Sequence, residues 1–204
     1  LNIIKIIGTD IKKIILGFMV ATAFLSMWIS NTATSVMMLP IGIAIIKQMK
    51  DLKNTPENEN LIFGKSLMLS IAFSASIGGV ATLIGTPPNL VFAGIIQEIY
   101  NIEISFLEWF MFGLPISIIL LFIAWVYLTN VAFKFKQDKF DEGKKEIHRQ
   151  LKDIGSMSYE EKIVLTVFIL TGIAWITRTF FLNNFLPNLD DSIIALISGI
   201  SLFI

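Results

Sequence analysis

The 204-residue chain contains 54% hydrophobic and only 16% charged residues, and its mean hydropathy is +0.74. A soluble domain has nearer ~25% charged residues, so the composition argues against a soluble enzyme or a disordered chain. The net charge of zero argues against nucleic-acid binding. With no cysteine and one histidine, the chain has no thiolate metal site and little scope for histidine catalysis. We therefore predict an all-α, polytopic membrane protein that is not an enzyme.

The first charge-free stretch runs from Ile14 to Ile46. As one straight helix it would measure about 50 Å, at ~1.5 Å per residue, whereas the hydrocarbon core of a bilayer is ~30 Å thick. A polar run, Ser30-Asn31-Thr32, divides it into two arms that are each too short to cross easily, and lysines flank both outer ends. Residues 11–49 are therefore expected to form a re-entrant hairpin with its tip at mid-membrane depth.

The second stretch, residues 61–99, is predicted to be a broken transmembrane helix. Its interruption is the run Gly85-Thr86-Pro87-Pro88-Asn89. Proline lacks a backbone N–H and keeps the preceding residue out of the α conformation, so we expect the backbone to unwind at 85–89. Unwound backbone inside a bilayer is tolerated only where it is buried in protein or lines a cavity. The break is therefore a candidate binding site, and a simple proline kink is the alternative.

The remaining segments are predicted by their apolar runs and charges. They are a transmembrane helix at 107–135, a cytoplasmic loop at 136–160, a transmembrane helix at 161–182 and the start of a truncated transmembrane helix at 191–204. Arg178 lies near the end of the third of these segments, where we expect it to snorkel to the membrane interface.

Lysine and arginine are concentrated in residues 1–13, 47–65 and 134–162, whereas residues 97–108 and 183–191 contain acidic but no basic side chains. Cytoplasmic loops carry the excess of basic residues in membrane proteins. The hairpin should therefore open to the cytoplasm, and the broken helix should lead outward.

Polar side chains at the hairpin tip suggest an ion site. Ser26 and Ser30 are four residues apart, which would place both hydroxyls on one helix face. Hydroxyl, amide and carbonyl oxygens suit a hard cation, and the absence of a carboxylate favours Na⁺ over Ca²⁺ or Mg²⁺. The arm that starts after Asn31 offers free N–H groups and a positive helix end to a carboxylate. Ordinary helix capping by serine, asparagine and threonine is the alternative.

Two sequence motifs are similar to those of a known family. The run WISNTATSVMMLP at 28–40 resembles the hairpin motif of the divalent anion:sodium symporter family, and SIGG at 76–79 with GTPPNL at 85–90 resembles its unwound helix. The resemblance covers essentially the whole chain. It implies two inverted repeats, a homodimer, and an elevator motion of a transport domain against a scaffold in the cytoplasmic membrane of a prokaryote.

The same resemblance implies roles for individual residues. The sodium ligands would be Ser26, Ser30, Asn31 and the Gly85 carbonyl. The substrate would be bound by Ser30, Asn31, Thr32, Thr86 and Pro87. The chain departs from the family pattern because it has no second Ser-Asn-Thr hairpin, so a second sodium site and half of the substrate pocket are missing. It also begins at Leu1 and stops within an apolar run, and we expect one half of an inverted-repeat transporter.

The predicted function is sodium-coupled symport of dicarboxylates such as succinate, malate and fumarate. A related anion transporter for citrate or sulfate, coupled to protons or working by exchange, is the alternative. A channel would need polar rings along a pore, and an intramembrane enzyme would need a nucleophile–base pair or metal ligands; the spans provide neither. The expected partners are the divalent anion, membrane lipid and a second copy of the full-length protein, with no nucleic acid.

Overall fold

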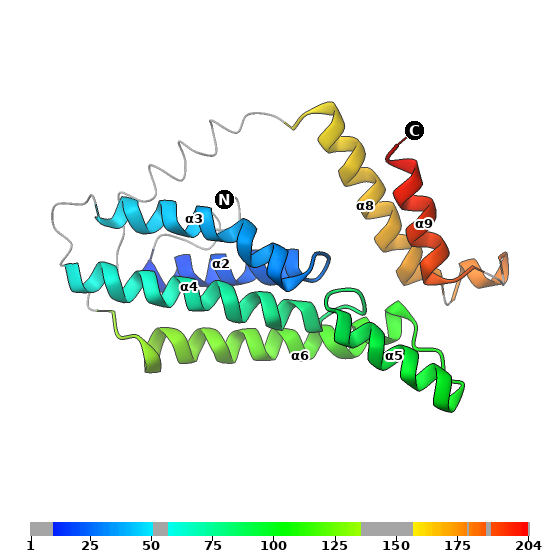
Figure 1. Ribbon diagram of the computed structural model, residues 1–204, viewed down its shortest axis with the longest axis horizontal. Helices are drawn as coiled ribbons and strands as arrows, with labels where there is room; N and C mark the ends of the chain where they lie inside the picture. The colour runs from blue at the N-terminus through cyan, green and yellow to red at the C-terminus, as the bar shows by residue number, and fades with distance from the viewer. Residues whose placement is uncertain (1–9, 51–56, 136–156, 179, 187–188, 204) are drawn as a thin grey trace.

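The computed structural model describes residues 10–50, 57–135, 157–178, 180–186 and 189–203, and most of these residues are helical, as predicted (Figure 1). Residues 136–156 of the predicted cytoplasmic loop lie outside the described part. The elements are α2 (Ile11–Ser26), α3 (Asn31–Lys50), α4 (Glu57–Val80), α5 (Pro87–Tyr100), α6 (Phe106–Val126), the π-helical η1 (Tyr127–Ala132), α8 (Tyr159–Arg178), the 3-10 helix η2 (Leu182–Asn184) and α9 (Asp191–Ser201).

Helix α4 is the centre of the main bundle and packs against α2, α3 and α6. Its buried side chains Phe63, Leu67 and Ile71 form one apolar core with residues of α2 and α3, including Phe18 and Ile45. Helices α8 and α9 pack on each other as a second pair, inclined to the long axes of α4 and α6, and α8 contacts the bundle through α6. This arrangement leaves the α2–α3 turn and the α4–α5 break near each other.

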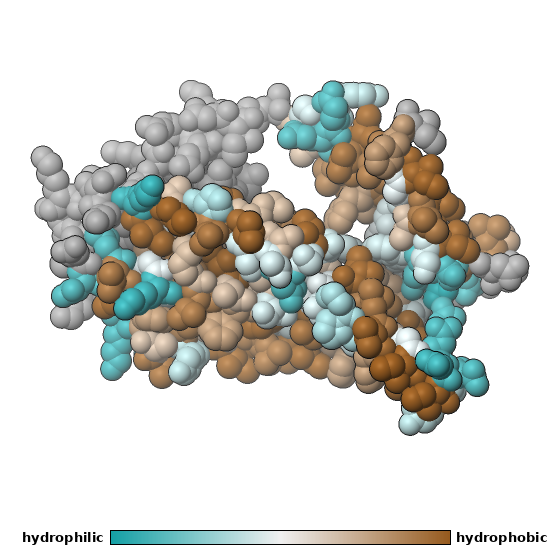
Figure 2. Space-filling view, viewed as in Figure 1, coloured by the Kyte–Doolittle hydropathy of each residue, from teal (hydrophilic) through white to brown (hydrophobic). Residues whose placement is uncertain are grey.

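Among the described residues, two helices are long and apolar enough to cross a membrane, by length and composition: Asn58–Val80 and Phe106–Ala132. Two more apolar helices, Asn31–Lys47 and Asp191–Ser201, are shorter than that. Figure 2 shows hydrophobic residues over the flank of the bundle, with weakly polar residues gathered where α3 and α5 begin. The hairpin tip and the break are therefore polar interruptions of a largely apolar surface.

The broken helix is interrupted at residues 81–86, between Val80 and Pro87. The expected unwinding at 85–89 is corrected accordingly, because the two prolines open α5 instead of lying in the irregular segment. Proline is favoured at the first helical position, where its missing N–H would have no helical partner and its fixed φ already suits a helix. Thr86, which precedes Pro87, is extended with φ −149° and ψ 142°, as a pre-proline residue should be.

The end of α4 is held by donors from α5, α6 and the break. The last four carbonyl groups of any helix lack partners inside it. In α4 the Ile77 carbonyl accepts from Ser117 Oγ at 2.9 Å, and the Gly78 carbonyl accepts from Ala81 N at 3.0 Å. The Gly79 carbonyl accepts from Asn89 Nδ2 at 3.0 Å, and the Val80 carbonyl accepts from Trp109 Nε1 at 3.0 Å. Each orphan carbonyl is satisfied, so the break is a built structure with defined hydrogen bonds.

From the sequence we expected Arg178 to snorkel to the membrane interface. Instead, Arg178 is buried, with 6% exposure. Its guanidinium Nη2 lies 2.7 Å from Glu103 Oε1, and its Nε lies 2.8 Å from Asp191 Oδ1. Its Nη1 donates to the Leu189 carbonyl at 3.3 Å. The other carboxylate oxygen of Asp191 accepts from the Phe106 N–H at 3.0 Å. The guanidinium thus joins the α5–α6 connection to the adjoining ends of α8 and α9.

Replacing Arg178 by leucine in the full-length protein should lower its stability by ~3 kcal/mol or more, because the Asp191 carboxylate then loses its buried partner. Glu103→Gln is the matched control: the Glu103 side chain is 58% exposed, and an exposed pair contributes at most ~1 kcal/mol. Thermal unfolding in detergent would measure both changes. Equal losses in the two variants would contradict the dominant role assigned to the Arg178–Asp191 pair.

Candidate functional site

The hairpin tip is the turn between α2 and α3, and it differs in one respect from the sequence expectation. Helix α2 ends at Ser26, so Ser30 lies beyond it and the two hydroxyls do not share a helix face. The N–H groups of Trp28 and Ile29 both donate to the Leu25 carbonyl, which closes the helix before Ser30. The Ser30 hydroxyl oxygen accepts from the Ala33 N–H at 3.3 Å, and Ser30 therefore caps α3.

A cluster of three oxygens lies where the hairpin tip meets α4. The fully buried Ser26 hydroxyl is 2.8 Å from Asn31 Oδ1 and 2.6 Å from the Ala75 carbonyl oxygen of α4. A hydroxyl has one proton, so it can donate to only one of these two acceptors at a time. One of the two acceptor oxygens is therefore left without a proton from Ser26. A group of oxygens with too few protons to pair them all is suited to binding a cation.

Gly79 joins the tip to the break. A Cβ at this position would overlap the Asn31 side-chain amide, so the absence of a side chain lets Asn31 lie against α4. Its carbonyl oxygen in turn lies against Gly85, where a Cβ would approach it to 2.5 Å. The Gly85 carbonyl accepts no hydrogen bond from the described residues. Asn31 and Gly85, both expected as sodium ligands, thus both lie against Gly79.

Two further residues hold these segments in place, and the sequence analysis assigned them no role. The Thr82 hydroxyl donates to the Met27 carbonyl, which ties the break to the hairpin turn. The buried Asn89 amide donates to the carbonyls of Gly79 and Thr82, at 3.0 Å and 2.8 Å. The available signal was an asparagine directly after two prolines, because its side-chain amide can donate hydrogen bonds where the two preceding residues have no N–H.

The two helix N-termini near the break differ in what they offer an anion. At the start of α3, the N–H groups of Asn31 and Thr32 have no partner among the described residues, and the helix dipole adds positive potential there. At the start of α5, Pro87 and Pro88 have no N–H, and Asn89 N donates to the Thr86 carbonyl at 3.1 Å. The α3 terminus is therefore the stronger anion site of the two.

Thr32 and Pro87 are exposed and Thr86 is half-buried. Thr86 is the residue before α5, and its side chain makes no capping hydrogen bond. No hydrogen bond among the described residues joins Thr32 to Thr86 or Pro87. The structure thus brings together Ser26, Asn31, Gly79 and Gly85, and it leaves these three expected substrate residues at accessible positions around them.

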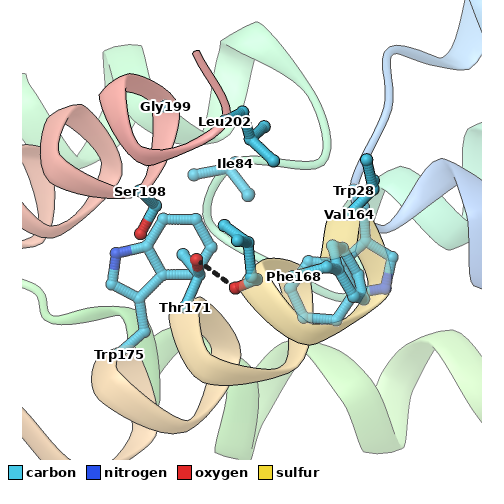
Figure 3. Close-up of a pocket in the computed structure, with 10 residues that line it drawn as sticks. Trp28, Ile84, Val164, Phe168, Thr171, Trp175, Ser198, Gly199 and Leu202 are labelled. Carbon is cyan, nitrogen blue, oxygen red and sulfur yellow. Dashed lines mark hydrogen bonds between the residues drawn. The ribbon is translucent and has the colours of Figure 1, made fainter. Parts of the chain in front are cut away.

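An apolar cavity of about 240 Å³ lies between the tip and the α8–α9 pair (Figure 3). Its lining includes Trp28 from the tip, Ile84 from the break, and Phe168 and Trp175 from α8. Trp28 packs edge-on against Phe168, with ring centroids 4.8 Å apart. The lining carries no charged side chain; its hydroxyls are those of Thr171, which is already bonded to its own helix, and Ser198. This cavity is therefore unsuited to a dicarboxylate.

The oxygen cluster contains no titratable side chain, and the described residues contain no group of three or more His, Cys, Asp or Glu side chains that could hold a metal ion. Neutral oxygens bind a monovalent cation better than a divalent one, which needs carboxylates to offset its charge. The geometry is thus compatible with Na⁺ and offers little to Ca²⁺ or Mg²⁺.

Broken helices whose ends meet inside an apolar helical bundle are typical of secondary transporters. The comparison with known proteins agrees with this class. The chain belongs to the family described as the sodium:sulfate symporter transmembrane region, which matches residues 1–204. This is a family of transporters and not of enzymes.

Named relatives add detail. The chain is 45% identical over 208 residues to the sodium-dependent dicarboxylate transporter SdcS of Staphylococcus aureus strain USA300. It is 43% identical to the protein of the same name from Staphylococcus saprophyticus. Both alignments cover 100% of this chain but 40% of the relative, so the chain spans about two-fifths of the length of these transporters.

Proposed function

We propose that this chain is part of a sodium-coupled secondary transporter that carries dicarboxylates across the cytoplasmic membrane of a bacterium. The observation that carries the proposal is the buried oxygen cluster of Ser26, Asn31 and Ala75 next to the free N–H groups that begin α3. One feature suits a small cation and the other a carboxylate. The names of the two staphylococcal relatives supply Na⁺ and dicarboxylate as the ions that fit these features.

In this proposal, Na⁺ is bound by oxygens of Ser26, Ser30, Asn31 and the Gly85 carbonyl. The Ser30 oxygen that caps α3 keeps a second lone pair for the ion. The substrate carboxylate lies at the α3 terminus and contacts Ser30, Asn31 and Thr32, with Thr86 and Pro87 beside it. The positive end of α3 and the bound Na⁺ both offset the charge of the anion. Each ion therefore favours binding of the other.

We further propose that α2 and α3 form a re-entrant hairpin, that the transporter moves as an elevator and that it is a homodimer bounded by lipid. The re-entrant geometry is supported by the length of α2, which has only 16 residues, and by the polar turn that joins it to α3. The elevator is supported by the division into a bundle, α2 to α6, and an α8–α9 pair that contacts the bundle through α6 and the α5–α6 connection.

The function is tested by uptake into liposomes that contain the full-length protein. An inward Na⁺ gradient should drive accumulation of radiolabelled succinate, and replacing Na⁺ by choline should abolish it. Unlabelled malate and fumarate should compete with succinate. The family description names sulfate, so sulfate or citrate uptake driven by a proton gradient without Na⁺ would instead support the alternative anion transporter.

The membrane topology is tested by cysteine labelling, because the chain contains no cysteine of its own. In the full-length protein, Lys13→Cys and Lys47→Cys at the two ends of the hairpin should both react with an impermeant maleimide applied from the cytoplasmic side. Ile102→Cys, in the α5–α6 connection, should react only from outside. All three positions are exposed. Labelling of Lys13→Cys and Lys47→Cys from opposite sides would mean that the hairpin crosses the membrane.

A further inference from the structure

Asn89 is buried at the break, with 8% exposure, and is not one of the proposed ion or substrate ligands. It lies in the first turn of α5, directly after the two prolines that open this helix. Its amide nitrogen donates to the Gly79 carbonyl of α4 at 3.0 Å and to the Thr82 carbonyl of the break at 2.8 Å. A side-chain amide has two N–H donors. Both are therefore used to join α5 to the far side of the break.

Gly85, whose carbonyl is a proposed sodium ligand, is held by the same two carbonyl groups. Its own N–H donates to the Thr82 carbonyl at 3.3 Å. Its Cα lies against the Gly79 carbonyl oxygen, which a Cβ on Gly85 would approach to 2.5 Å. The amide of Asn89 thus bonds to both of the groups against which Gly85 is placed.

The described residues contain no second donor that could replace the Asn89 amide. The Gly79 carbonyl accepts from Asn89 alone, and the Thr82 carbonyl accepts otherwise only from the more distant Gly85 N–H. The two prolines before Asn89 have no N–H, and the backbone N–H of Asn89 already donates to the Thr86 carbonyl at 3.1 Å. Without the Asn89 side chain, the Gly79 carbonyl would be left unpaired, and Gly85 would lose the fixed position of its two contacts.

Hydrogen bonding also decides which carbonyl at the break is available to an ion. The carbonyls of Gly79 and Thr82 are paired with Asn89, whereas the Gly85 carbonyl accepts no hydrogen bond from the described residues. A ligand oxygen that is already held in position has less freedom to lose when the ion binds. The arrangement therefore leaves one carbonyl free and restrains the residue that carries it.

Two other side chains satisfy carbonyls at the same end of α4 without contacting Gly85. Ser117 donates to the Ile77 carbonyl and Trp109 to the Val80 carbonyl, both from α6. Neither carbonyl is hydrogen-bonded to Gly85. They show what pairing the end of α4 requires by itself, and they provide a matched comparison for Asn89.

We propose that Asn89 is a positioning residue of the sodium site, which acts through Gly79 and Thr82 to hold the Gly85 carbonyl in place for the ion. The inference rests on the proposed function, because it takes the Gly85 carbonyl as a Na⁺ ligand. Loss of the Asn89 amide weakens Na⁺ binding directly. It weakens dicarboxylate binding only through the coupling between the two ions, so saturating Na⁺ restores the affinity for the dicarboxylate.

The test compares Asn89→Ala with Ser117→Ala in the full-length protein. The Na⁺ concentration that gives half-maximal succinate uptake into liposomes should rise about tenfold or more in Asn89→Ala, as expected when a buried polar group loses its partner. It should stay at the wild-type value in Ser117→Ala. Both variants should melt at a lower temperature in Na⁺-free choline buffer, because each leaves a carbonyl of α4 unpaired. At saturating Na⁺, the KM of Asn89→Ala for succinate should match that of the wild type.

Asn89→Ser carries the same test if Asn89→Ala does not fold. A serine hydroxyl has one proton and can pair at most one of the two carbonyls, so its Na⁺ requirement should also rise. Asn89 variants that melt at a lower temperature but keep the Na⁺ requirement of Ser117→Ala would show a purely structural role and overturn the inference. Wild-type uptake that does not depend on Na⁺ would instead refute the proposed function, and the sodium site with it.

Discussion

Asn31→Ala in the full-length protein is expected to weaken the binding of Na⁺ and dicarboxylate together. The Asn31 amide oxygen lies 2.8 Å from the Ser26 hydroxyl in the oxygen cluster, while its backbone N–H is free at the start of α3. In the proposed site this residue faces both ions, and a coupling between two bound ions acts equally in both directions. The loss should be about 1–3 kcal/mol, the range for a buried polar group left without its partner.

Calorimetric titration of the dicarboxylate at several Na⁺ concentrations would measure this loss. Ser26→Ala should mainly raise the Na⁺ requirement, because its hydroxyl is fully buried behind the tip. Ser35→Ala is the control: its hydroxyl bonds the Asn31 carbonyl one turn away and does not enter the cluster. If Asn31→Ala keeps the wild-type sodium dependence and loses only substrate affinity, Asn31 is a substrate ligand alone.

Gly78→Ala is expected to destabilise the folded protein strongly. A Cβ at Gly78 would overlap the carbonyl group and Cα of Ala23, and backbone atoms cannot rotate away as a side chain can. Helices α2 and α4 would have to separate, and α4 packs on α2 along the length of the bundle. Overpacking of this kind costs typically ~1–3 kcal/mol and occasionally more. Thermal unfolding of the purified full-length protein would measure the loss.

The adjacent glycine provides the matched comparison. A Cβ at Gly79 would overlap the Asn31 side chain, which can turn aside, so Gly79→Ala should retain most of its stability and lose Na⁺-coupled binding. Gly94→Ala, where nothing lies within 4 Å of a new Cβ, should be stabilised by ~0.5–1 kcal/mol through better helix propensity. Equal melting temperatures for Gly78→Ala and Gly94→Ala would contradict the close packing of α2 on α4.

Much of the helical organisation followed from local sequence. The polar run at 30–32 predicted a turn between two helices, and the structure places the turn between Ser26 and Asn31. The prolines at 87 and 88 predicted an interrupted helix, and α4 and α5 are separate. Both predictions depend on short-range effects: polar side chains satisfy free helix ends, and proline blocks the hydrogen bond of its own helix.

The wrong predictions concern residues whose type is compatible with more than one local conformation or environment. The sequence suggested unwinding at 85–89, but the prolines start α5 because the first turn of a helix does not need their N–H groups. Ser30 was expected on the same face as Ser26, but it caps α3 because α2 ends earlier. Arg178 was expected to snorkel to the membrane interface, but it is buried and paired with Glu103 and Asp191.

The sequence by itself determined the all-helical class, the apolar segments and the identity of the polar interruptions, because the length of an apolar run and the backbone chemistry of proline are local properties of the chain. Only the tertiary structure decided which oxygens meet. Ala75 and Gly79 have no functional side chain, yet their backbones complete the cluster with Ser26 and Asn31 because α4 packs closely on α2 and α3. Contacts between residues so far apart in the chain depend on helix packing, which no local pattern specifies.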